Sequence, residues 1–312
     1  MKKLFSKISW FALFIMLLIN RANAQGCSDA GVCTIHSFKN NTEKFDTADK
    51  NNNEVTVGFA FGKGERSTSN YTQYLEYTRS LTDKTSVTGK IGFSEIRGEL
   101  ANTSGPGDLF LSVNHAFDTK HKWQKSFVAG LKIPFNNADI VEEGIHLPMP
   151  YQTSLGTTDL VLGINYSFKS FGATLAVQQP LKPINSNQFL PEKYSSVPLA
   201  DNYLPSNKFS RKGDVLLRFS YNFDLDKKFS VRPSLLSIYH EANDTYLDAN
   251  KMRVEIEKSS GLTMNGNVFV DYRVSKTGSI ELSLGAPFVI RTNRPDGLTR
   301  SFVASLEYRF SF

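Results

Sequence analysis

Three aspartates recur in similar surroundings and are the residues whose type and spacing most invite a chemical role. Asp108, Asp159 and Asp214 stand in "GPGDLFL", "GTTDLVL" and "KGDVLL", 51 and 55 residues apart. One hypothesis is a carboxylate cluster near a pore mouth that binds or filters solutes, as acidic rings do in cation-favouring pores. The other, which we favour, is that each aspartate ends a loop by accepting hydrogen bonds from nearby backbone N–H groups.

The elements that carry these aspartates are predicted to be strands. From Val55 onward, apolar and polar residues alternate, which is the pattern of strands with two different faces. Most of the alternating segments have at least 9 residues, enough to cross a bilayer as tilted strands. Twelve segments lie near 54–62, 69–80, 84–96, 106–118, 124–135, 156–168, 171–181, 212–223, 227–241, 260–274, 277–290 and 298–312.

The connections between these segments alternate in length. After the even-numbered segments the gaps are tight, as in "TDK", "KS" and "KT". After the odd-numbered segments they are longer, and 136–155 and 182–211 are long, polar and rich in Pro and Asn. Short turns at one end and long loops at the other are typical of an outer-membrane barrel. The sequence therefore predicts an all-β fold, a transmembrane antiparallel β-barrel of about 12 strands over 54–312, with periplasmic N- and C-termini.

The two faces of the predicted strands differ as lipid and water require. In "DLVLGINYSF", Leu160 and Leu162 fall on one parity, opposite Asp159 and Asn165. Lipid would not accept the second face, which must therefore line the lumen. Charges of both signs on this face predict internal salt bridges and, since twelve strands enclose little space, a narrow or partly plugged passage. Besides the three aspartates, these charged lumen residues are Lys90, Lys132, Arg218, Arg232, Asp271, Arg273, Glu281, Glu307 and Arg309.

The even-numbered strands end in aromatic residues, and the chain stops on "YRFSF". In the predicted topology these ends lie at the periplasmic interface, where Tyr and Phe form an aromatic girdle. The predicted girdle consists of Phe117, Tyr166, Phe168, Tyr221, Phe223, Tyr272, Tyr308, Phe310 and Phe312. The last strand must also pair with the first, because an open edge in lipid is prohibitively costly. This C-terminal pattern resembles the signal that bacterial barrel-assembly machinery recognises, so we expect that machinery and outer-membrane lipids as partners.

Catalysis finds little support in the sequence. A hydrolase needs a nucleophile, a base and an orienting group within reach of one another. The five histidines lack a paired spacing such as H-E-x-x-H. His240 in "IYHEAND" is a candidate for an outer-membrane lipase site, but the His-x-Ser-Asn-Gly motif expected of such enzymes is absent. We expect no catalytic residue, no metal and no cofactor.

The first 24 residues have the features of a secretory signal peptide. Lys2, Lys3 and Lys7 precede the short apolar core "ISWFALFIMLLI", and "NRANA" closes on small residues, so we expect cleavage after Ala24. Removing four positive charges with this leader lowers the net charge from +6 to about +2, which leaves no basic patch that would argue for nucleic acid. The expected location is the bacterial outer membrane.

The segment between leader and barrel, 25–53, is polar and holds both cysteines. Export through an oxidising compartment favours a disulfide between Cys27 and Cys33 over two reduced thiols. Two positions are open to the segment: inside the barrel as a plug, or in the periplasm.

Three motifs between Gly105 and Leu181 carry a family resemblance: "GPGDLFLSVNHAF", "FVAGLKIPFNN" and "LGTTDLVLGINYSF...FGATLAVQQPL". Their order resembles the outer-membrane transporter family of the phenol meta-cleavage degradation pathway, whose members are similar in style to fatty-acid channels. That family has G-x-G-D-L, G-L-x-L-P-T-G-like and L-G-T-G-x-x-D-like strands. Here "KIPFNN" replaces the Pro-Thr-Gly, and "GTTD" lacks the second glycine. The resemblance implies passage of small hydrophobic or aromatic compounds.

The main functional hypothesis is a barrel that lets such small-molecule solutes cross passively, with 136–155 and 182–211 shaping the entrance. One alternative is a barrel without transport that presents its outer loops to a partner. A lipid hydrolase is the less favoured alternative.

Overall fold

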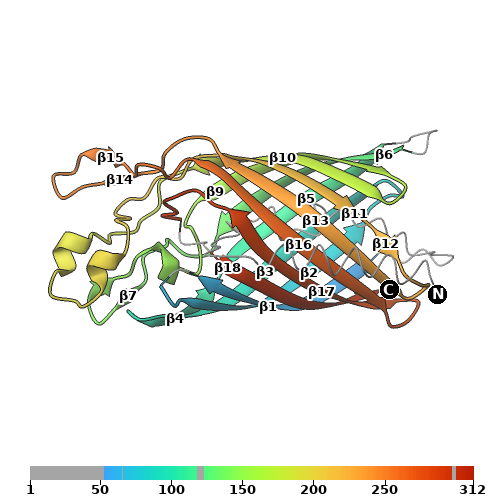
Figure 1. Ribbon diagram of the computed structural model, residues 1–312, viewed down its shortest axis with the longest axis horizontal. Coiled ribbons are helices and arrows are strands. Elements are labelled where there is room, and N and C mark those ends of the chain that lie inside the picture. Colours follow the sequence, from blue (N-terminus) through green and yellow to red (C-terminus); the bar gives the residue numbers. More distant parts are fainter. Residues whose placement is uncertain (1–52, 65, 118–122, 297–299) are drawn as a thin grey trace.

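The computed structural model describes residues 53–64, 66–117, 123–296 and 300–312. In this part of the chain, twelve long antiparallel strands close into a barrel, which confirms the predicted fold class (Figure 1). The predicted leader, residues 25–52 and the two cysteines lie outside the described residues. The barrel strands are β1 (Asn53–Gly64), β2 (Ser69–Ser80), β3 (Thr85–Arg97), β5 (Asp108–Phe117), β6 (Trp123–Pro134), β9 (Thr158–Phe168), β10 (Phe171–Lys182), β11 (Asp214–Tyr221), β13 (Phe229–His240), β16 (Gly261–Arg273), β17 (Gly278–Val289) and β18 (Arg300–Ser311).

Pairing of β1 with β18 brings together the two ends of the described chain. Glu54 lies opposite Ser311, and the register continues along both strands with one irregularity near Gly64. At the other end of the pair, next to Glu54 and Ser311, the N–H of Phe312 donates to the carbonyl oxygen of Asn53 at 2.9 Å, and the N–H of Asn53 donates to the carbonyl oxygen of Phe312 at 3.1 Å. Elsewhere β11 pairs with β13, so each barrel strand has a neighbour on both sides. Lipid therefore meets no long unpaired backbone edge.

Two short strands extend the barrel wall. β4 (Asn102–Pro106) pairs with the outer part of β3, and β12 (Phe223–Asp224) continues β11 along β13. The sequence predicted a single segment over 106–118, but the wall is interrupted at Gly107 between β4 and β5. The N–H of Gly107 donates to the carbonyl of Gly92 at 2.9 Å, which keeps the interrupted strand attached to β3.

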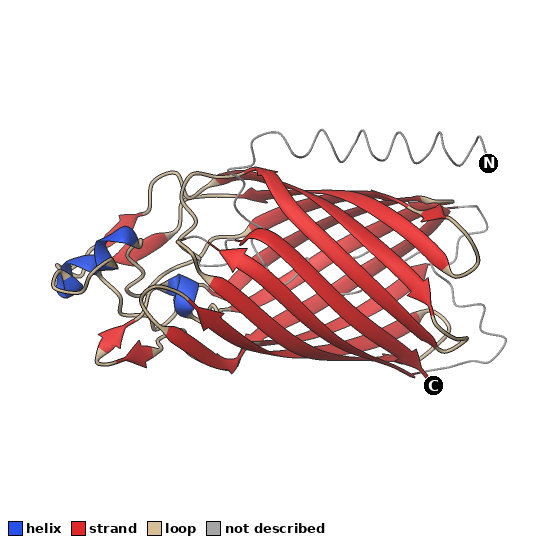
Figure 2. Cartoon of the chain, turned by 60° about the horizontal axis from the view of Figure 1, so that its bottom comes forward, coloured by secondary structure: helices blue, strands red, loops and turns tan. Residues whose placement is uncertain are grey.

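Long loops gather at one end of the barrel, and the C-terminus lies at the other end with the short turns (Figures 1 and 2). Three of the loops contain small elements that strand periodicity did not predict. These elements are β7 (Val141–Glu142), β8 (Ile145–His146) and the 3-10 helix η2 (Met149–Tyr151); η3 (Pro191–Tyr194) and η4 (Ala200–Asn202); and β14 (Thr245–Leu247) with β15 (Arg253–Glu255). We call residues 135–157, which carry the first three, the outer lid.

Apolar packing holds these loops together as a cap. Tyr151 and Leu147 of the outer lid are buried against Phe189 of the loop between β10 and β11. A second cluster buries Met149 of the lid with Phe209 of the same loop. Burying side chains of this size contributes about 1.5–3 kcal/mol each, so the lid has a defined position over the barrel mouth.

The outward face of the barrel is apolar along its length. Val57, Phe59 and Leu306 at mid-strand are 45–57% exposed. The nine residues of the predicted girdle lie at or next to the C-terminal ends of β5, β9, β11, β16 and β18, exposed or half-buried, and Phe310 stacks on Phe312 with ring centroids 5.8 Å apart. Within the described ranges, no helix has the length and apolarity to cross a membrane.

The inward face is layered. An apolar patch, formed by Val128, Val161, Ala176, Leu216, Leu236 and Ile238, covers one side of the lumen. Charged side chains lie above this patch, near the cap, and below it, toward the C-terminus. The strands that carry the patch are β6, β9, β10, β11 and β13. The wall from β16 through β18 to β3 contributes no residue to this patch.

Candidate functional site

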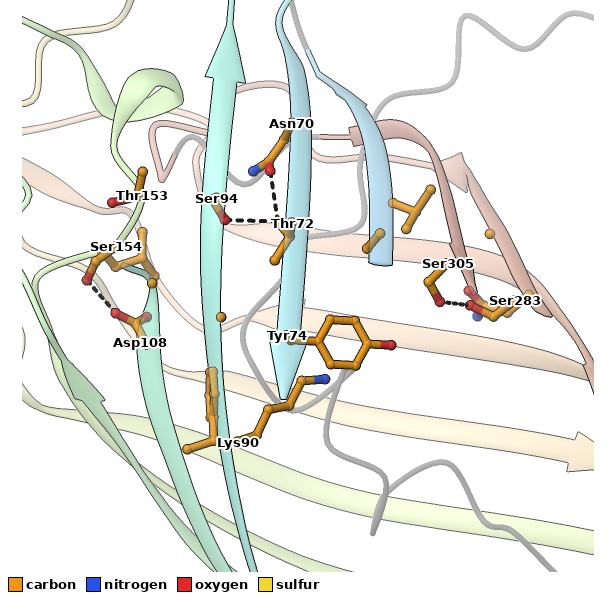
Figure 3. Close-up of a pocket in the computed structure, with 18 of the residues that line it drawn as sticks. Asn70, Thr72, Tyr74, Lys90, Ser94, Asp108, Thr153, Ser154, Ser283 and Ser305 are labelled. Atoms are coloured by element: carbon orange, nitrogen blue, oxygen red, sulfur yellow. Dashed lines mark hydrogen bonds between the residues drawn. The ribbon is translucent and has the colours of Figure 1, made fainter. Parts of the chain in front are cut away.

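A cavity of about 190 Å³ lies inside the barrel beneath the outer lid. Strand alternation creates its polar wall: Asn70, Thr72 and Tyr74 are every second residue of β2 and therefore point to the same side. Figure 3 shows these side chains around the cavity with Lys90 and Ser94 of β3. Apolar lining residues stand beside charged ones: Phe110 is the cross-strand partner of Lys90, and Leu236 is that of Arg218. Phe269 also lines the cavity, so its surface is a mixture of polar and apolar side chains.

Polar side chains of the wall hydrogen-bond to one another. Thr72 donates to Asn70 Oδ1 at 2.9 Å, and its hydroxyl lies 2.9 Å from that of Ser94 (Figure 3). Ser283 and Ser305 pair their hydroxyls at 2.6 Å on the neighbouring wall. Hydroxyl groups both donate and accept and can rotate, so these pairs can re-form around a bound polar group.

Lys90 places a positive charge in this wall. Its Nζ lies 3.9 Å from the centroid of the Tyr74 ring and 3.9 Å from Glu76 Oε2. The Tyr74 hydroxyl in turn donates to Glu307 Oε2 at 2.7 Å. These contacts fix the aromatic ring between the lysine and β18, which lies on the far side of β1 from β2.

The outer lid forms the roof of the cavity. Thr153 and Ser154 of the lid line it from above, and Ser154 donates a hydrogen bond to Asp108 (Figure 3). Thr153 donates to the carbonyl of Pro106 at 3.0 Å, while Asn136 Nδ2 donates to Thr153 Oγ1 at 2.8 Å. The lid is therefore tied to the wall at β4 and β5 by hydrogen bonds as well as by its apolar packing.

The three recurrent aspartates lie in one chain of ion pairs across the barrel mouth. Lys132 Nζ lies 3.7 Å from Asp108 and 2.8 Å from Asp159. Arg211, from the loop before β11, pairs with Asp214 and lies 3.6 Å from Asp159. All but Asp108 are at most 1% exposed. Each carboxylate thus faces a cation, and the arrangement is a neutralised chain rather than an acidic ring open to solution.

The series of ion pairs continues into the loops. His240 Nδ1 lies 2.7 Å from Asp214 Oδ1, and its Nε2 lies 2.9 Å from Asp244 Oδ1. Arg291 Nη1 is 3.7 Å from Asp244, and Arg291 Nη2 donates to Asp296 at 2.5 Å. We call this set the outer charge chain; its members are Asp108, Lys132, Asp159, Arg211, Asp214, His240, Asp244, Arg291 and Asp296.

The loop members of the outer charge chain have shifted pKa values. Burial by itself lowers the pKa of Arg211, but the carboxylates of Asp214 and Asp159 reverse this and raise it. Burial raises the pKa of Asp296, and the cations of Arg291 and Arg211 outweigh that effect and hold it below the ordinary range. Both groups therefore keep their charges, which is what a buried ion-pair chain needs for stability.

A second charged cluster fills the lumen nearer the C-terminal end. Arg309 Nη2 lies 2.8 Å from both Asp271 and Glu281, and Arg232 lies 3.0 Å from Glu281. Glu307 is also 3.4 Å from Arg309. Among the charged residues predicted for the lumen, Lys90, Lys132, Arg218, Arg232, Asp271, Glu281, Glu307 and Arg309 are buried and Arg273 is half-buried. These side chains narrow the barrel below the cavity.

Four members of the outer charge chain were missed by sequence reasoning. Arg211, Asp244, Arg291 and Asp296 lie in loops, where no alternation shows which way a side chain points. The spacing of Asp244 four residues after His240 was the only local signal. As the base of a lipase, His240 would need one ring nitrogen in contact with a nucleophile. Both of its ring nitrogens face carboxylates instead.

A cleft of about 450 Å³ opens between the loops outside the barrel. The outer lid contributes Pro150, and the loop between β10 and β11 contributes Tyr203. Arg66 from the β1–β2 connection and Arg294 from the β17–β18 connection also line it. We call it the outer cleft; it lies on the β17, β18, β1 and β2 side of the mouth, and Arg291 and Asp296 of the outer charge chain flank the segment of the β17–β18 connection that lines it.

Comparison with known proteins rests on structure. Neither a protein-family model nor a curated protein matches the sequence. The COG4313 outer membrane channel from Pseudomonas putida F1 superimposes with a TM-score of 0.58, covering 83% of this chain and 95% of that chain at 13% identity. The chain has the fold of an outer-membrane channel. The KdgM porin in complex with disordered oligogalacturonate (TM-score 0.45, 7% identity, 83% and 99% covered) and the NanC porin (0.45, 10%, 83% and 98%) share the barrel more distantly.

Proposed function

We propose that this outer-membrane barrel is a channel for passive uptake of small solutes that have a hydrophobic or aromatic body. The observation that carries the proposal is the lumen cavity of about 190 Å³, whose lining includes Phe110, Leu236 and Phe269. An apolar cavity of about 150 Å³ accepts benzene, so this one is large enough for a single ring with a small substituent. A wide aqueous pore would instead need the larger circumference of about 16 to 18 strands.

The route we infer runs from the outer cleft past the lid to the cavity. Pro150 of the outer lid lines the cleft, and Gln152 to Leu155 of the same lid line the cavity. One short stretch of chain therefore separates the two spaces. The strand-borne members of the outer charge chain lie on β5, β6, β9, β11 and β13, so a solute would pass where the lid faces β17, β18, β1 and β2. Loop movements on the nanosecond-to-microsecond scale are sufficient for such a passage.

The hydrogen bonds of the lid set how easily it moves. Within the lid, β7 and β8 pair as a hairpin. Asn187 Nδ2 donates to the carbonyls of Ala138 and Leu147 at 2.8 and 3.0 Å, which fixes both ends of this hairpin. The stretch that roofs the cavity is held by Thr153 and Ser154 through exchangeable hydroxyl bonds. We infer that this stretch yields to the solute while the hairpin stays in place.

Uptake into liposomes tests the function. The purified chain is reconstituted, and radiolabelled benzyl alcohol and a disaccharide are added outside, with protein-free liposomes as the baseline. The channel predicts faster uptake of the aromatic solute than the baseline and none of the disaccharide. Folding is checked by resistance to unfolding in detergent before heating. A fully folded barrel without uptake would contradict the proposal and support a barrel that presents its loop cap to a partner.

Insertion into the outer membrane through the barrel-assembly machinery is the second part of the proposal. β18 supports it, because this last strand closes the barrel against β1 and turns Tyr308, Phe310 and Phe312 outward. Deletion of Phe312 is expected to lower the amount of assembled barrel in outer-membrane fractions. Equal amounts with and without Phe312 would contradict recognition through this end.

A further inference from the structure

The outer cleft carries a surplus of positive charge. Its charged lining residues are Arg66, Arg294 and Asp201, two cations against one carboxylate. Arg66 is exposed, and its guanidinium carbon lies 5.6 Å from the centroid of the Tyr203 ring. That ring is fixed, since Tyr203 is 5% exposed and its hydroxyl lies 2.9 Å from that of Tyr151. A guanidinium held over an aromatic face keeps its edge N–H donors directed away from the ring.

The segment that carries Arg294 is fixed as well. The neighbouring Asn293 donates from its backbone N–H to the carbonyl of Lys258 at 3.1 Å and from its side chain to that of Glu257 at 2.8 Å. Arg294 itself is 5% exposed. The cleft therefore places two arginines, from separate loops, around one space with an aromatic floor.

The lumen cavity adds no surplus of its own. Lys90 and Arg218 line it, but the carboxylate of Asp108 lines it too and Glu76 lies 3.9 Å from Lys90. The charge preference is therefore assigned to the outer cleft. Arg294 also has contacts within the protein, so the preference we derive depends on the charge of the cleft and not on a vacant hydrogen bond.

We propose that the outer cleft binds the carboxylate of small amphipathic solutes, and that the channel therefore favours single-ring or short-chain carboxylates over neutral and cationic compounds of the same shape. This inference rests on the proposed channel function and names its substrate class. Arginine presents paired donors that match the two oxygens of a carboxylate. Tyr203 provides an apolar surface beside Arg66 for the body of the solute.

Charge-matched solutes provide the test. Benzoate, benzamide and benzamidinium have one ring, nearly the same shape and charges of −1, 0 and +1 at neutral pH. Uptake of each is measured in liposomes with and without the reconstituted full chain, at low ionic strength so that screening is weak. Charge-lined clefts raise association rates by about tenfold or more. We therefore expect protein-dependent uptake of benzoate to exceed that of benzamidinium by about tenfold.

Two variants locate the effect. Arg66→Gln removes an exposed positive charge from the cleft, and we expect the ratio of benzoate to benzamidinium uptake to fall by about three- to fivefold, as the loss of one exposed ion pair would give. Lys193→Gln removes an exposed positive charge from η3, outside the cleft lining. This control is expected to keep the wild-type ratio. Because both sites are exposed, both variants should fold.

The outcomes separate the two proposals. Equal uptake of the three solutes, or equal loss of the ratio in Arg66→Gln and Lys193→Gln, would overturn carboxylate recognition and leave the channel function standing. Uptake of none of them above protein-free liposomes by a folded barrel would overturn the channel function, and this inference with it.

Discussion

Nδ1 of His240 lies 2.7 Å from Oδ1 of Asp214, and the two residues are direct partners where β13 and β11 meet at the barrel mouth. Asp244 Oδ1 lies 2.9 Å from the other ring nitrogen. Carboxylates only accept hydrogen bonds, and an imidazole donates from both nitrogens only when it is protonated. The histidine therefore joins the wall to the loop cap as the shared partner of two buried carboxyl groups.

Replacing this histidine should loosen the mouth of the barrel. His240→Ala leaves two buried carboxylates facing each other, and loss of one partner from a buried pair costs about 3–5 kcal/mol. The measurement is the free energy of unfolding by urea in lipid vesicles. His115→Ala is the control, because His115 is exposed and bonds only at the surface to Thr85, so we expect a change within about 0.5 kcal/mol. Equal effects of the two variants would contradict the role of the outer charge chain.

Asp296 gives the outer charge chain a defined pH dependence. Its pKa is lowered in the folded protein, chiefly because Arg291 and Arg211 outweigh the effect of burial; His240 and Asp214 also face it. A carboxyl with a lowered pKa contributes stability that is fully present above its unfolded pKa of about 3.9. That contribution is lost as the pH falls through the lower, folded value.

Comparison of wild type with Asp296→Asn measures this contribution. The stability advantage of the wild type should be constant from neutral pH down to about pH 5 and shrink below about pH 4. Urea unfolding at a series of pH values gives the difference directly. An advantage that grows as the pH falls would have the wrong sign for this account.

The apolar outer face makes a depth-dependent prediction. Leu306 lies in the middle of β18, outward and 53% exposed, whereas Phe312 follows the end of the strand. A lysine at the bilayer midplane of a barrel costs about 2–4 kcal/mol, and near the interface about 0–1 kcal/mol. Leu306→Lys should therefore lower the free energy of unfolding in vesicles much more than Phe312→Lys. Equal tolerance of both lysines, as at two water-exposed sites, would contradict a lipid-facing wall.

Filling the cavity should block the channel without unfolding it. Ala60 and Val57 lie on the same strand, β1, but Ala60 lines the cavity and Val57 is 57% exposed on the outside. Ala60→Trp introduces an indole into a space of about 190 Å³, and uptake of a single-ring solute is expected to fall at least about tenfold, because close-packed interiors leave no detour. Val57→Trp should leave uptake unchanged. Uptake by Ala60→Trp at the wild-type rate would place the route elsewhere.

The barrel was predictable because membrane crossing leaves a regular mark on the sequence. Lipid on one side and water on the other force every second residue to be apolar, and short turns limit where the strands end. The interruption at Gly107 escaped prediction because alternation continues on both sides of it. The small elements of the cap escaped because they are held by packing of Leu147 and Tyr151 against Phe189, which belongs to another loop and shares no period with them.

The candidate site was predictable only in part, for the same reason. Parity placed Asp159, Lys132 and Asp214 on the lumen side, where the structure has them. It did not reveal that Arg211 from a loop lies between two of them, which turns an apparent acidic cluster into an ion-pair chain. The outer cleft was out of reach as well, since Arg66 and Arg294 belong to connections at opposite ends of the chain. Contacts between loops have no local signal.

Locking the lid shows whether solutes reach the lumen cavity by passing the outer lid. A side chain built at Gly105 would place its Cβ 3.2 Å from Thr153 Oγ1 and 3.9 Å from its Cγ2, so cysteine side chains at these two positions would be in contact. Gly105→Cys with Thr153→Cys, in a chain in which Cys27 and Cys33 are replaced by Ser, therefore joins β4 to the lid. Uptake of a single-ring solute is measured before and after reduction, with each single-cysteine variant as the control. We expect the oxidised protein to be closed to the solute and reduction to restore uptake; equal uptake in both states would mean that the solute does not pass the outer lid.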